Sequence, residues 1–425
     1  MASEGDISSN ALSEFLRQTK QAYLDAVRAG KGRQWSVVMG NEAGDLDSIA
    51  SAIAYAWYAS KVKGASAVPL TQTPRSELQL RAENLYAFEL AHLHPESDIL
   101  CIDDIPESHP FPSVNFALVD HNRLQSRFSR DNPDARVVAV IDHHEDEGLY
   151  KDTADPRIVV VPTGSCASLV TQLFQSHPDQ LTPELATLLL SSILIDTSGL
   201  KPGGKAEEAD RRAASLLIPL ASALRHQTER TTLAEQAPEE IPALQDLHAT
   251  LQEKKASVAH LNTLDLLRRD YKEYALTPPK SPSREILVGL SSVPIGFKSW
   301  LPHHPEFWSQ TEHFMSERGL TVLGILTSFR DTEKVGKSGR GKHRREQMYV
   351  VRDDEDLAKT LFAALDECEE LELKRKTFPD YGVHKGFGPT LRAQIWKQKN
   401  VDATRKTTAP IVKGIIEGRN KTANL

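Results

Sequence analysis

Four short apolar runs of the sequence end in acidic or histidine clusters, and this pattern constrains the fold more than any other feature. The runs are SVVMG, DILCI, FALV and VVAVI, and the clusters that follow them are Asp45 and Asp47, Asp103 and Asp104, Asp120-His121-Asn122, and Asp142-His143-His144. Apolar runs of this length predict strands that are buried on both faces of a parallel sheet. Because ligands bind beyond the carboxyl ends of parallel strands, we expect the clusters to converge on one crevice.

Helical patterns alternate with apolar runs in the first half of the chain. They cover residues 47–63, 165–175 and 183–195, and further β-rich runs lie at 65–70 and 157–162. This alternation predicts an α/β fold with a doubly wound, mainly parallel sheet.

A chain of 425 residues is long enough for two domains. A polar stretch with few β-forming residues covers 226–242, and we expect it to link a first domain at 1–225 to a second at 243–425. The second domain is expected to contain helices at 243–261 and 356–376 and strands at 284–295 and 320–331. This mixture predicts a smaller α/β domain.

Composition excludes several classes of protein. The chain is 40% hydrophobic and 26% charged, as in soluble globular proteins, and it has no apolar run of membrane-spanning length. The first residues, MASEGDISSN, do not resemble a secretory signal. Three widely spaced cysteines favour a reducing compartment, so we expect a cytoplasmic protein without a thiolate zinc site. A net charge of −7 gives no reason to expect nucleic acid as a partner.

Each acidic cluster also has a purely structural interpretation. A lone Asp after a strand is usually a turn former or a helix N-cap, which fits Asp47, and Asp103 and Asp104 equally fit a turn. Recurrence favours a metal site instead, because VDHN and IDHH follow two neighbouring apolar strands and Asp196 ends another apolar run. Carboxylates and imidazoles at this density suit divalent cations such as Mg, Mn or Co.

Together these motifs resemble the DHH phosphoesterase superfamily, whose name describes Asp142-His143-His144. GNEAGDLDSIASA (40–52), LVDHN (118–122), VIDHH (140–144) and ILIDTSGLK (193–201) resemble its four motifs in order. The resemblance is strongest to the branch that contains family II inorganic pyrophosphatases, fungal cytosolic exopolyphosphatases and prune-type proteins. The second half resembles the C-terminal DHHA2 domain of this branch, and the resemblance covers about residues 30–420.

The resemblance implies a centre with two divalent cations. One cation would be held by Asp45 and Asp120, and the other by Asp47, Asp120, His143 and Asp196. Asp120 would bridge the two cations and is the first of the implied catalytic residues. His144 matches a position that contacts the substrate phosphate and assists the leaving group, and His121 is a further candidate contact.

Asn41 departs from the pyrophosphatase pattern, in which this position of the first motif is His. An amide is a neutral and weaker ligand than imidazole, so Asn41 should reduce the preference for Mn or Co over Mg. Asn at this position resembles the exopolyphosphatase and prune pattern, with Asn41 binding the metal directly or through water.

Cations for a phosphate-chain substrate are expected in the second domain. By resemblance to DHHA2, Lys272 in LLRRDYKEY and Arg405 and Lys406 in TRK would bind phosphate, with Lys298 as a weaker candidate. The plausible arrangement is an acidic, metal-bearing domain that faces this basic domain, with the active site in the cleft between them. The basic segment 334–345 is expected to be a loop between two strands, which either holds distal phosphates or solubilises the chain.

The resemblance therefore implies a metal-dependent exopolyphosphatase that acts on linear polyphosphate as a cytoplasmic monomer, without nucleic acid or membrane partners. A second hypothesis shortens the substrate to pyrophosphate, nucleoside polyphosphates or cyclic nucleotides. A third is a scaffold that retains the fold without turnover. The second half lacks the GGGH motif of the nuclease-type accessory domain, which argues against a nuclease.

Overall fold

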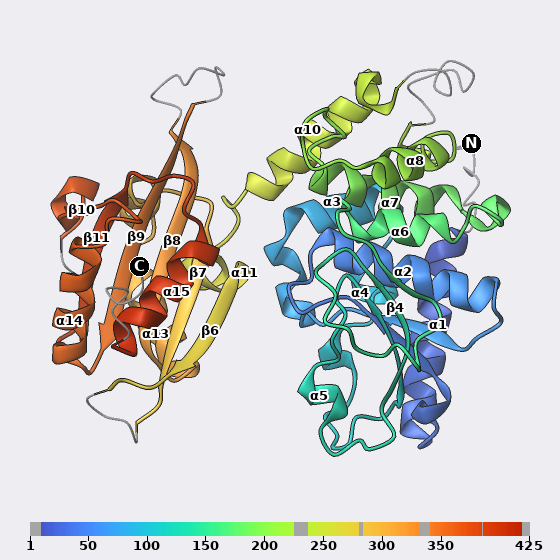
Figure 1. Ribbon diagram of the computed structural model, residues 1–425, viewed down its shortest axis with the longest axis horizontal. Helices are drawn as coiled ribbons and strands as arrows, with labels where there is room; N and C mark the ends of the chain where they lie inside the picture. The colour runs from blue at the N-terminus through green and yellow to red at the C-terminus, as the bar shows by residue number, and fades with distance from the viewer. Residues whose placement is uncertain (1–9, 225–236, 280–283, 332–340, 385, 419–425) are drawn as a thin grey trace, which may run out of the picture. The chain divides into compact units, whose positions relative to one another are not determined.

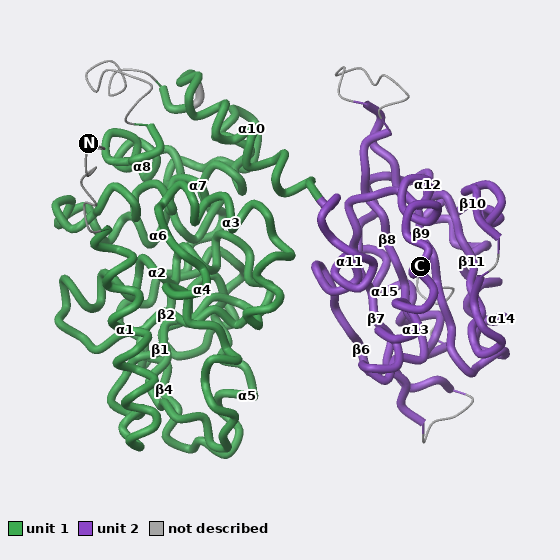
Figure 2. Tube along the Cα trace, turned by 180° about the vertical axis from the view of Figure 1, so that it is seen from behind, with its two compact units in different colours: residues 1–257 green, residues 258–425 purple. Residues whose placement is uncertain are grey.

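The structure is a computed structural model that describes residues 10–224, 237–279, 284–331, 341–384 and 386–418 (Figure 1). The chain forms two compact units, Met1–Ser257 and Val258–Leu425, which are described separately (Figure 2). This division lies C-terminal to the linker expected at 226–242, most of which is outside the described ranges. The domain boundaries expected at residues 225 and 243 remain a prediction.

Unit 1 contains a five-stranded sheet in the order β2-β1-β3-β4-β5, and all four pairings are parallel. Its strands are β1 (Ser36–Met39), β2 (Ala67–Leu70), β3 (Asn115–Val119), β4 (Arg136–Asp142) and β5 (Arg157–Val159). The predicted doubly wound parallel sheet is confirmed. Strand order reverses between β1 and β3, and ligands bind at such a switch point in open α/β sheets.

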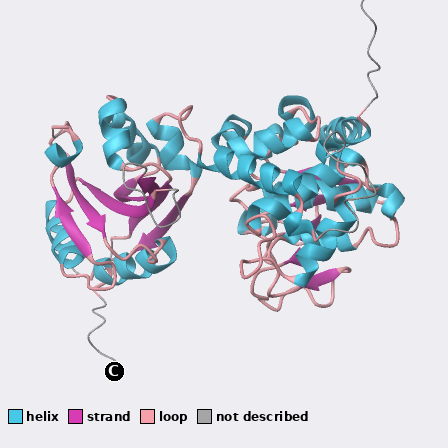
Figure 3. Ribbon diagram, turned by 90° about the horizontal axis from the view of Figure 1, so that it is seen from above, coloured by secondary structure: helices cyan, strands magenta, loops and turns pink. Residues whose placement is uncertain are grey.

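Helices cover both faces of this sheet (Figure 3). They are α1 (Ala11–Arg28), α2 (Leu46–Lys61), α3 (Ala82–Leu90), α4 (Pro95–Asp98), α5 (Ser126–Ser129), α6 (Cys166–Gln172), α7 (Pro183–Asp196), α8 (Glu208–Leu217) and α10 (Pro242–Ala256). Alternate residues of the strands point to two apolar clusters, with Val38 in one and Val37 in the other. Helix α2 is buried along nearly its whole length, which fixes the loop that precedes it.

The DILCI run is not a strand of the sheet, so this prediction was wrong. One isolated bridge joins Cys101 to Thr71, and Ile102–Asp104 forms a 3-10 turn. Asp104 accepts a hydrogen bond from the Cys101 N–H (2.9 Å) and pairs with the Arg75 guanidinium, while Asp103 accepts from the Arg75 backbone N–H (3.0 Å). These two carboxylates therefore stabilise a turn, which is the alternative that the sequence allowed.

Within unit 1, helix α10 packs against the C-terminal end of α7. Gln252 donates to the Ile195 carbonyl (3.0 Å), His248 donates to the Leu194 carbonyl (3.0 Å), and Gln245 donates to the Gly199 carbonyl (3.0 Å). The last carbonyls of a helix lack partners within the helix, so these side chains satisfy groups that would otherwise be unpaired. Helix α10 thereby anchors the end of α7 that carries Asp196.

Unit 2 contains a six-stranded sheet in the order β10-β11-β9-β8-β7-β6, in which only the β7–β8 pairing is parallel among the described strands. Its elements are α11 (Thr263–Arg269), β6 (Tyr271–Leu276), β7 (Ile286–Val293), α12 (Phe297–Trp300), α13 (Phe307–Glu317), β8 (Leu320–Asp331), β9 (Lys342–Arg352), α14 (Glu355–Asp366), β10 (Leu373–Lys376), β11 (Leu391–Gln398) and α15 (Arg405–Ile416). The smaller α/β domain that the sequence predicted is therefore present.

Two details of unit 2 differ from expectation. The helix expected at 356–376 ends at Asp366, and residues 373–376 form β10, because the acidic run after Asp366 is unfavourable at a helix C-terminus. Residues 342–345 of the expected basic loop begin strand β9, whereas 332–340 lie outside the described residues. None of the helices in the described ranges has the length and apolar character that crossing a membrane requires.

The two faces of the unit 2 sheet carry different helices (Figure 1). Helices α14 and α15 cover one face, where Val412 of α15 belongs to the same apolar cluster as Leu290 of β7. The other face carries α12 and α13, because the N–H of Phe297 donates to Glu346 Oε2 (3.0 Å) and the ring of Tyr271 packs on Phe314. We call the first of these surfaces the α15 face.

Candidate metal centre

The loop between β1 and α2 brings Asp45 and Asp47 to the carboxyl edge of the parallel sheet. Asp45 is the N-cap of α2, since its Oδ1 accepts the Ser48 backbone N–H (3.0 Å). The capping role that the sequence allowed for Asp47 is thus taken by Asp45. Gly44 has φ +57°, and a Cβ there would lie 2.0 Å from Thr73 Oγ1, so this turn requires glycine.

Asp47 lies at the N-terminus of α6 with both carboxylate oxygens hydrogen-bonded. Its Oδ1 accepts from Ser165 Oγ (2.7 Å), Ser192 Oγ (2.9 Å) and the Ala167 N–H (2.8 Å), and its Oδ2 accepts from the Cys166 N–H (2.7 Å). Backbone N–H groups at a helix N-terminus favour negative charge. The Asp47 side chain, which is only 2% exposed, is therefore held in one orientation.

Asp120 directly follows β3 and has a left-handed backbone conformation (φ +61°), which is uncommon for a residue other than glycine. Its N–H donates to the Ile141 carbonyl of β4 (3.0 Å), which holds this conformation in place. Its Oδ2 accepts from Ser48 Oγ (2.6 Å) and Asn41 Nδ2 (2.8 Å). Backbone strain of this kind persists where the surroundings fix it, and here it turns the carboxylate toward the β1–α2 loop.

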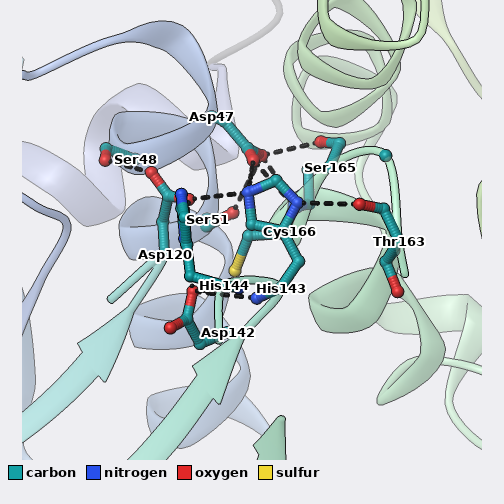
Figure 4. A network of polar contacts seen from close by, with 12 residues as sticks. Asp47, Ser48, Ser51, Asp120, Asp142, His143, His144, Thr163, Ser165 and Cys166 are labelled. Atoms are coloured by element: carbon teal, nitrogen blue, oxygen red, sulfur yellow. Dashed lines mark hydrogen bonds and ion pairs between the residues drawn. The ribbon is translucent and has the colours of Figure 1, made fainter. Parts of the chain in front are cut away.

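His143 joins the two aspartates (Figure 4). Its Nδ1 donates to the Thr163 carbonyl (3.0 Å), which leaves Nε2 3.1 Å from Asp120 Oδ1 and 3.7 Å from Asp47 Oδ2. Fixing one ring nitrogen in this way is how proteins orient a metal-binding imidazole. Ligand atoms of Asp120, His143 and His144 lie within 4.8 Å of one another, which is close enough to share one ion.

Crowding of the carboxylates perturbs their protonation. Burial raises the pKa of Asp120 to about 7, and the hydrogen bond from His143 partly opposes this rise. Burial alone would lower the pKa of His143, but the hydrogen bond to Asp120 and the charge of Asp47 raise it to about 10. The pKa of Asp196 lies well above its ordinary value because of burial, followed by repulsion from Asp47 and Asp45. Buried carboxylates that repel one another are the setting that a divalent cation stabilises.

Asp142 holds His144 in place. Its Oδ1 accepts from His144 Nδ1 (2.8 Å), and its Oδ2 accepts from Asn122 Nδ2 (2.5 Å). The hydrogen bond from His144 to Asp142 raises the pKa of His144, because it stabilises the protonated ring. Because the His144 side chain is 57% exposed and Nδ1 is engaged, Nε2 is the nitrogen available to a substrate.

His121 has an incomplete set of contacts. Its Nδ1 donates to the Val119 carbonyl (2.9 Å), and within the described parts of the chain its buried Nε2 has no hydrogen-bond partner. Burial lowers the pKa of His121, which favours the neutral ring with a lone pair on Nε2. An unpaired buried nitrogen is costly, so this atom suits a bound ion or water.

Asn41 contacts Asp120 rather than presenting a free ligand atom. Its Nδ2 donates to the Asp120 carboxylate and carbonyl, and its Oδ1 accepts the Ala43 N–H (2.9 Å). Turning the amide over would place its oxygen against both oxygens of Asp120, so this orientation is the favourable one. The oxygen that could bind a metal is therefore already engaged.

The four cations predicted to bind phosphate lie in unit 2, and the structure brings three of them to one place. Arg405, at the start of α15, pairs with the Asp270 carboxylate (2.7 Å) and donates to its carbonyl (2.7 Å). This contact puts Arg405 and its neighbour Lys406 at the beginning of β6, two residues before Lys272. Lys298 lies on α12, at the opposite face of the sheet.

Sequence reasoning missed the residues that orient the centre. Ser48, Ser165 and Ser192 donate to the metal-site aspartates, and Asp142, which accepts a hydrogen bond from Asn122, holds His144. The available signal was weak: the sequence GSCAS places Ser165 where a helix begins, and such a serine usually caps its own helix. Here its hydroxyl reaches a carboxylate 118 residues away in the sequence.

Two segments of the chain match known families. Residues 35–193 match the family described as "DHH family, N-terminal domain", and residues 249–415 match the one described as "DHHA2 domain". The first segment includes all five strands of the parallel sheet, and the second begins within α10 and continues into α15.

Named relatives match most of the chain. A protein of Schizosaccharomyces pombe named "Putative exopolyphosphatase" is 35% identical over 333 residues, which cover 74% of this chain and 78% of that protein. "Exopolyphosphatase PRUNE1" of Bos taurus is 32% identical over 413 residues, which cover 95% and 81%. "Manganese-dependent inorganic pyrophosphatase" of Bacillus subtilis is 28% identical over 237 residues, which cover 54% and 71%.

Proposed function

The chain belongs to the DHH family with a C-terminal DHHA2 domain, and on this premise we propose that it is a metal-dependent exopolyphosphatase. It would release orthophosphate from the end of linear inorganic polyphosphate. The observation that carries the proposal is the convergence of Asp47, Asp120 and His143 at the switch point of the parallel sheet. The names of the S. pombe and bovine relatives support the choice of substrate.

The centre would hold two divalent cations, Mg, Mn or Co. One would be bound by Asp45 and Asp120, and the other by Asp47, Asp120, His143 and Asp196. The donor set fits, because buried carboxylates with raised pKa values and one oriented imidazole lie together. When bound, such a pair lowers the pKa of water and stabilises charge on phosphoryl oxygens. Asn41 would act on the pair through Asp120.

The residues of the chain itself would position the substrate and move a proton. His144, held in its protonated form by Asp142, would donate a proton from Nε2 to the oxygen of the departing phosphate. His121 would contact the bound ions or water through its unpaired Nε2. Lys272, Arg405 and Lys406 would neutralise the neighbouring phosphates, with Lys298 as the weakest candidate.

The name of the B. subtilis relative supports a second candidate function, the hydrolysis of pyrophosphate. Other short phosphoanhydrides and cyclic nucleotides are further candidate substrates of this second function. The same centre would serve, and the difference would lie in how many phosphates the cationic residues hold. The three unpaired cysteines favour a reducing compartment, and we propose that the protein works as a monomer in the cytoplasm.

The test is a panel of substrates with purified full-length protein. Orthophosphate release is measured from long-chain polyphosphate, tripolyphosphate and pyrophosphate, and nucleoside monophosphate formation is measured from a cyclic nucleotide, each with Mg, Mn and Co. We expect the highest kcat/KM on polyphosphate. Pyrophosphate hydrolysis at an equal rate would favour the second function, and no turnover with any of the ions would favour a scaffold.

A further inference from the structure

Two arginines and a histidine outside the predicted phosphate site gather at one end of the unit 2 sheet. In the antiparallel β8–β9 pair, Ser328 lies opposite Arg345 and Arg330 lies opposite His343. Paired residues, and residues two apart on a strand, point to the same face of a sheet. Arg330, His343 and Arg345 therefore share one face, and we call them the ribbon cluster.

The ribbon cluster lies on the α15 face. Arg345 is also paired with Gln398 of β11, and the neighbouring Gln347 contacts Thr408 of α15 (3.4 Å). Arg345 Nε donates to the carbonyl of Val401, in the loop that leads into α15 (2.6 Å). The cluster is thus on the same face as Arg405, at the end where α15 begins.

Positive charge in the ribbon cluster is poorly compensated. His343 Nε2 bonds to Ser328 Oγ (2.9 Å) and Arg330 donates to the Gly341 carbonyl (3.4 Å), so the polar partners of these two are neutral. Considering only the described residues, no acidic side chain forms an ion pair with any of the three, and Asp402 is the acid whose charge reaches Arg345 and His343. Burial, followed by the charges of Arg345 and Arg330, lowers the pKa of His343. The positive charge of Arg330 and Arg345, with no ion-paired carboxylate beside it, makes a site for an anion.

The predicted phosphate site and the ribbon cluster occupy one rim of the sheet. Lys272 is paired with Leu290 on the α15 face, and Asp270, which holds Arg405, precedes β6. Through β7 and β8, Lys272 is level with Tyr349 of β9, and Arg345 lies four residues further along that strand. Three strand spacings of about 4.8 Å and four residues of about 3.3 Å put Arg345 roughly 20 Å from Lys272. A ligand that reaches both must be an extended polyanion.

We propose that Arg330, His343 and Arg345 form a second phosphate-binding site, which holds distal phosphates of a polyphosphate chain whose phosphates next to the cleaved end lie at Lys272, Arg405 and Lys406. This inference rests on the proposed function for its ligand. If this site exists, residues of β8 and β9 determine the preference of the protein for long polyphosphate chains. A substrate as short as pyrophosphate cannot span the two groups.

The experiment compares neutral variants of the cluster with a matched control. Arg330→Gln, Arg345→Gln and the double variant remove charge from the α15 face. Arg344→Gln removes the same charge from the adjacent position, where Arg344 pairs with Asp331 (3.5 Å) on the opposite face. Each full-length variant is assayed for kcat/KM on long-chain polyphosphate and on tripolyphosphate, and its melting temperature is compared with that of the wild type.

We expect the ratio of kcat/KM on long chains to that on tripolyphosphate to fall about tenfold in the double variant, because charged hydrogen bonds to the chain are lost. The ratio should stay at the wild-type value in Arg344→Gln. An unchanged ratio in the double variant, or an equal fall in Arg344→Gln, would overturn the second site.

A binding measurement separates this inference from the proposed function. Fluorescently labelled long-chain polyphosphate is titrated with wild type and variants in the presence of a chelator, so that no turnover occurs. The binding site stands if the wild type binds the chain and the double variant binds it about tenfold more weakly. If, in addition, the separate activity assay detects no phosphate release with any metal, the exopolyphosphatase function fails while the binding site stands. If the wild type does not bind, or the double variant binds equally well, the site is wrong.

Discussion

The acidic centre of unit 1 and the basic α15 face of unit 2 are built in opposite ways. Asp47 and Asp120 are 2% and 3% exposed, and each accepts several hydrogen bonds from side chains or backbone. Lys272 and Lys406 are exposed and Arg345 is half-buried. A buried and preorganised carboxylate has no substitute, whereas one exposed cation among several contributes little by itself. Single substitutions should therefore have large effects in the first region and small effects in the second.

The largest effect is expected for Asp120→Asn. The amide keeps much of the shape and accepts hydrogen bonds through one oxygen, but it removes the charge shared by both proposed cation sites. We expect kcat for orthophosphate release to fall at least about a thousandfold. The metal-free protein should melt no lower than the wild type, since burial of this carboxylate is opposed by its neighbours, as its raised pKa shows.

The matched control is Asp103→Asn, because Asp103 also follows an apolar run but binds the backbone of Arg75 in a turn. Its kcat should stay within about twofold of the wild-type value. If Asp120→Asn turned over substrate at the wild-type rate, the acidic centre would be no more sensitive to substitution than the α15 face. The proposal that Asp120 bridges the two cations would then be wrong.

A second effect concerns pH and belongs to the acidic centre alone. His143, with its pKa raised to about 10 by Asp120 and Asp47 against the effect of burial, carries a proton in the metal-free protein at neutral pH. A cation that binds Nε2 must displace this proton, so affinity should rise about tenfold per pH unit above pH 7. Below pH 7 the metal affinity should depend on pH more steeply. Asp120 has a pKa of about 7, so at lower pH a cation must displace a proton from Asp120 as well as the one on His143.

Calorimetric titration with Mn between pH 6.5 and 8.5 measures this slope. Repeating it in two buffers of different ionisation enthalpy counts the protons released. Affinity that does not depend on pH, with no proton release, would contradict ligation by His143. Asp103→Asn should show the same slope as the wild type.

The same contrast explains how much the sequence could predict. Asp45, Asp47, Asp120 and His143 could be placed together because each follows an apolar strand, and strands of a parallel sheet end at one edge. Ser192 could not be foreseen, since it lies within an apolar helix and reaches Asp47 only through the packing of α7 on α2. The DILCI run has the same strand-then-acid pattern, yet the Arg75 guanidinium holds its end in a turn.

Unit 2 was harder to anticipate for a physical reason. Its cations acquire a common face only through strand register, and a shift of one residue would exchange Arg345 for Arg344 on the α15 face. Local composition carries no information about that register. The basic segment 334–345 could therefore be recognised as basic, but not divided into residues on one face and residues on the other.

The smallest effect is expected for single lysines of unit 2, and it sharpens the comparison within that unit. Lys406→Gln should raise KM for polyphosphate about threefold to tenfold with little change in kcat, because an exposed cation contributes on the order of 1 kcal/mol to binding. Lys298→Gln should change KM less than twofold, since Lys298 lies on α12 at the opposite face of the sheet. Both are measured by initial rates at low and at physiological ionic strength, where the Lys406 effect should shrink as salt screens the exposed charge. An equal rise in KM for the two variants would mean that the chain is attracted by overall charge, and the α15 face would then have no special role in substrate binding.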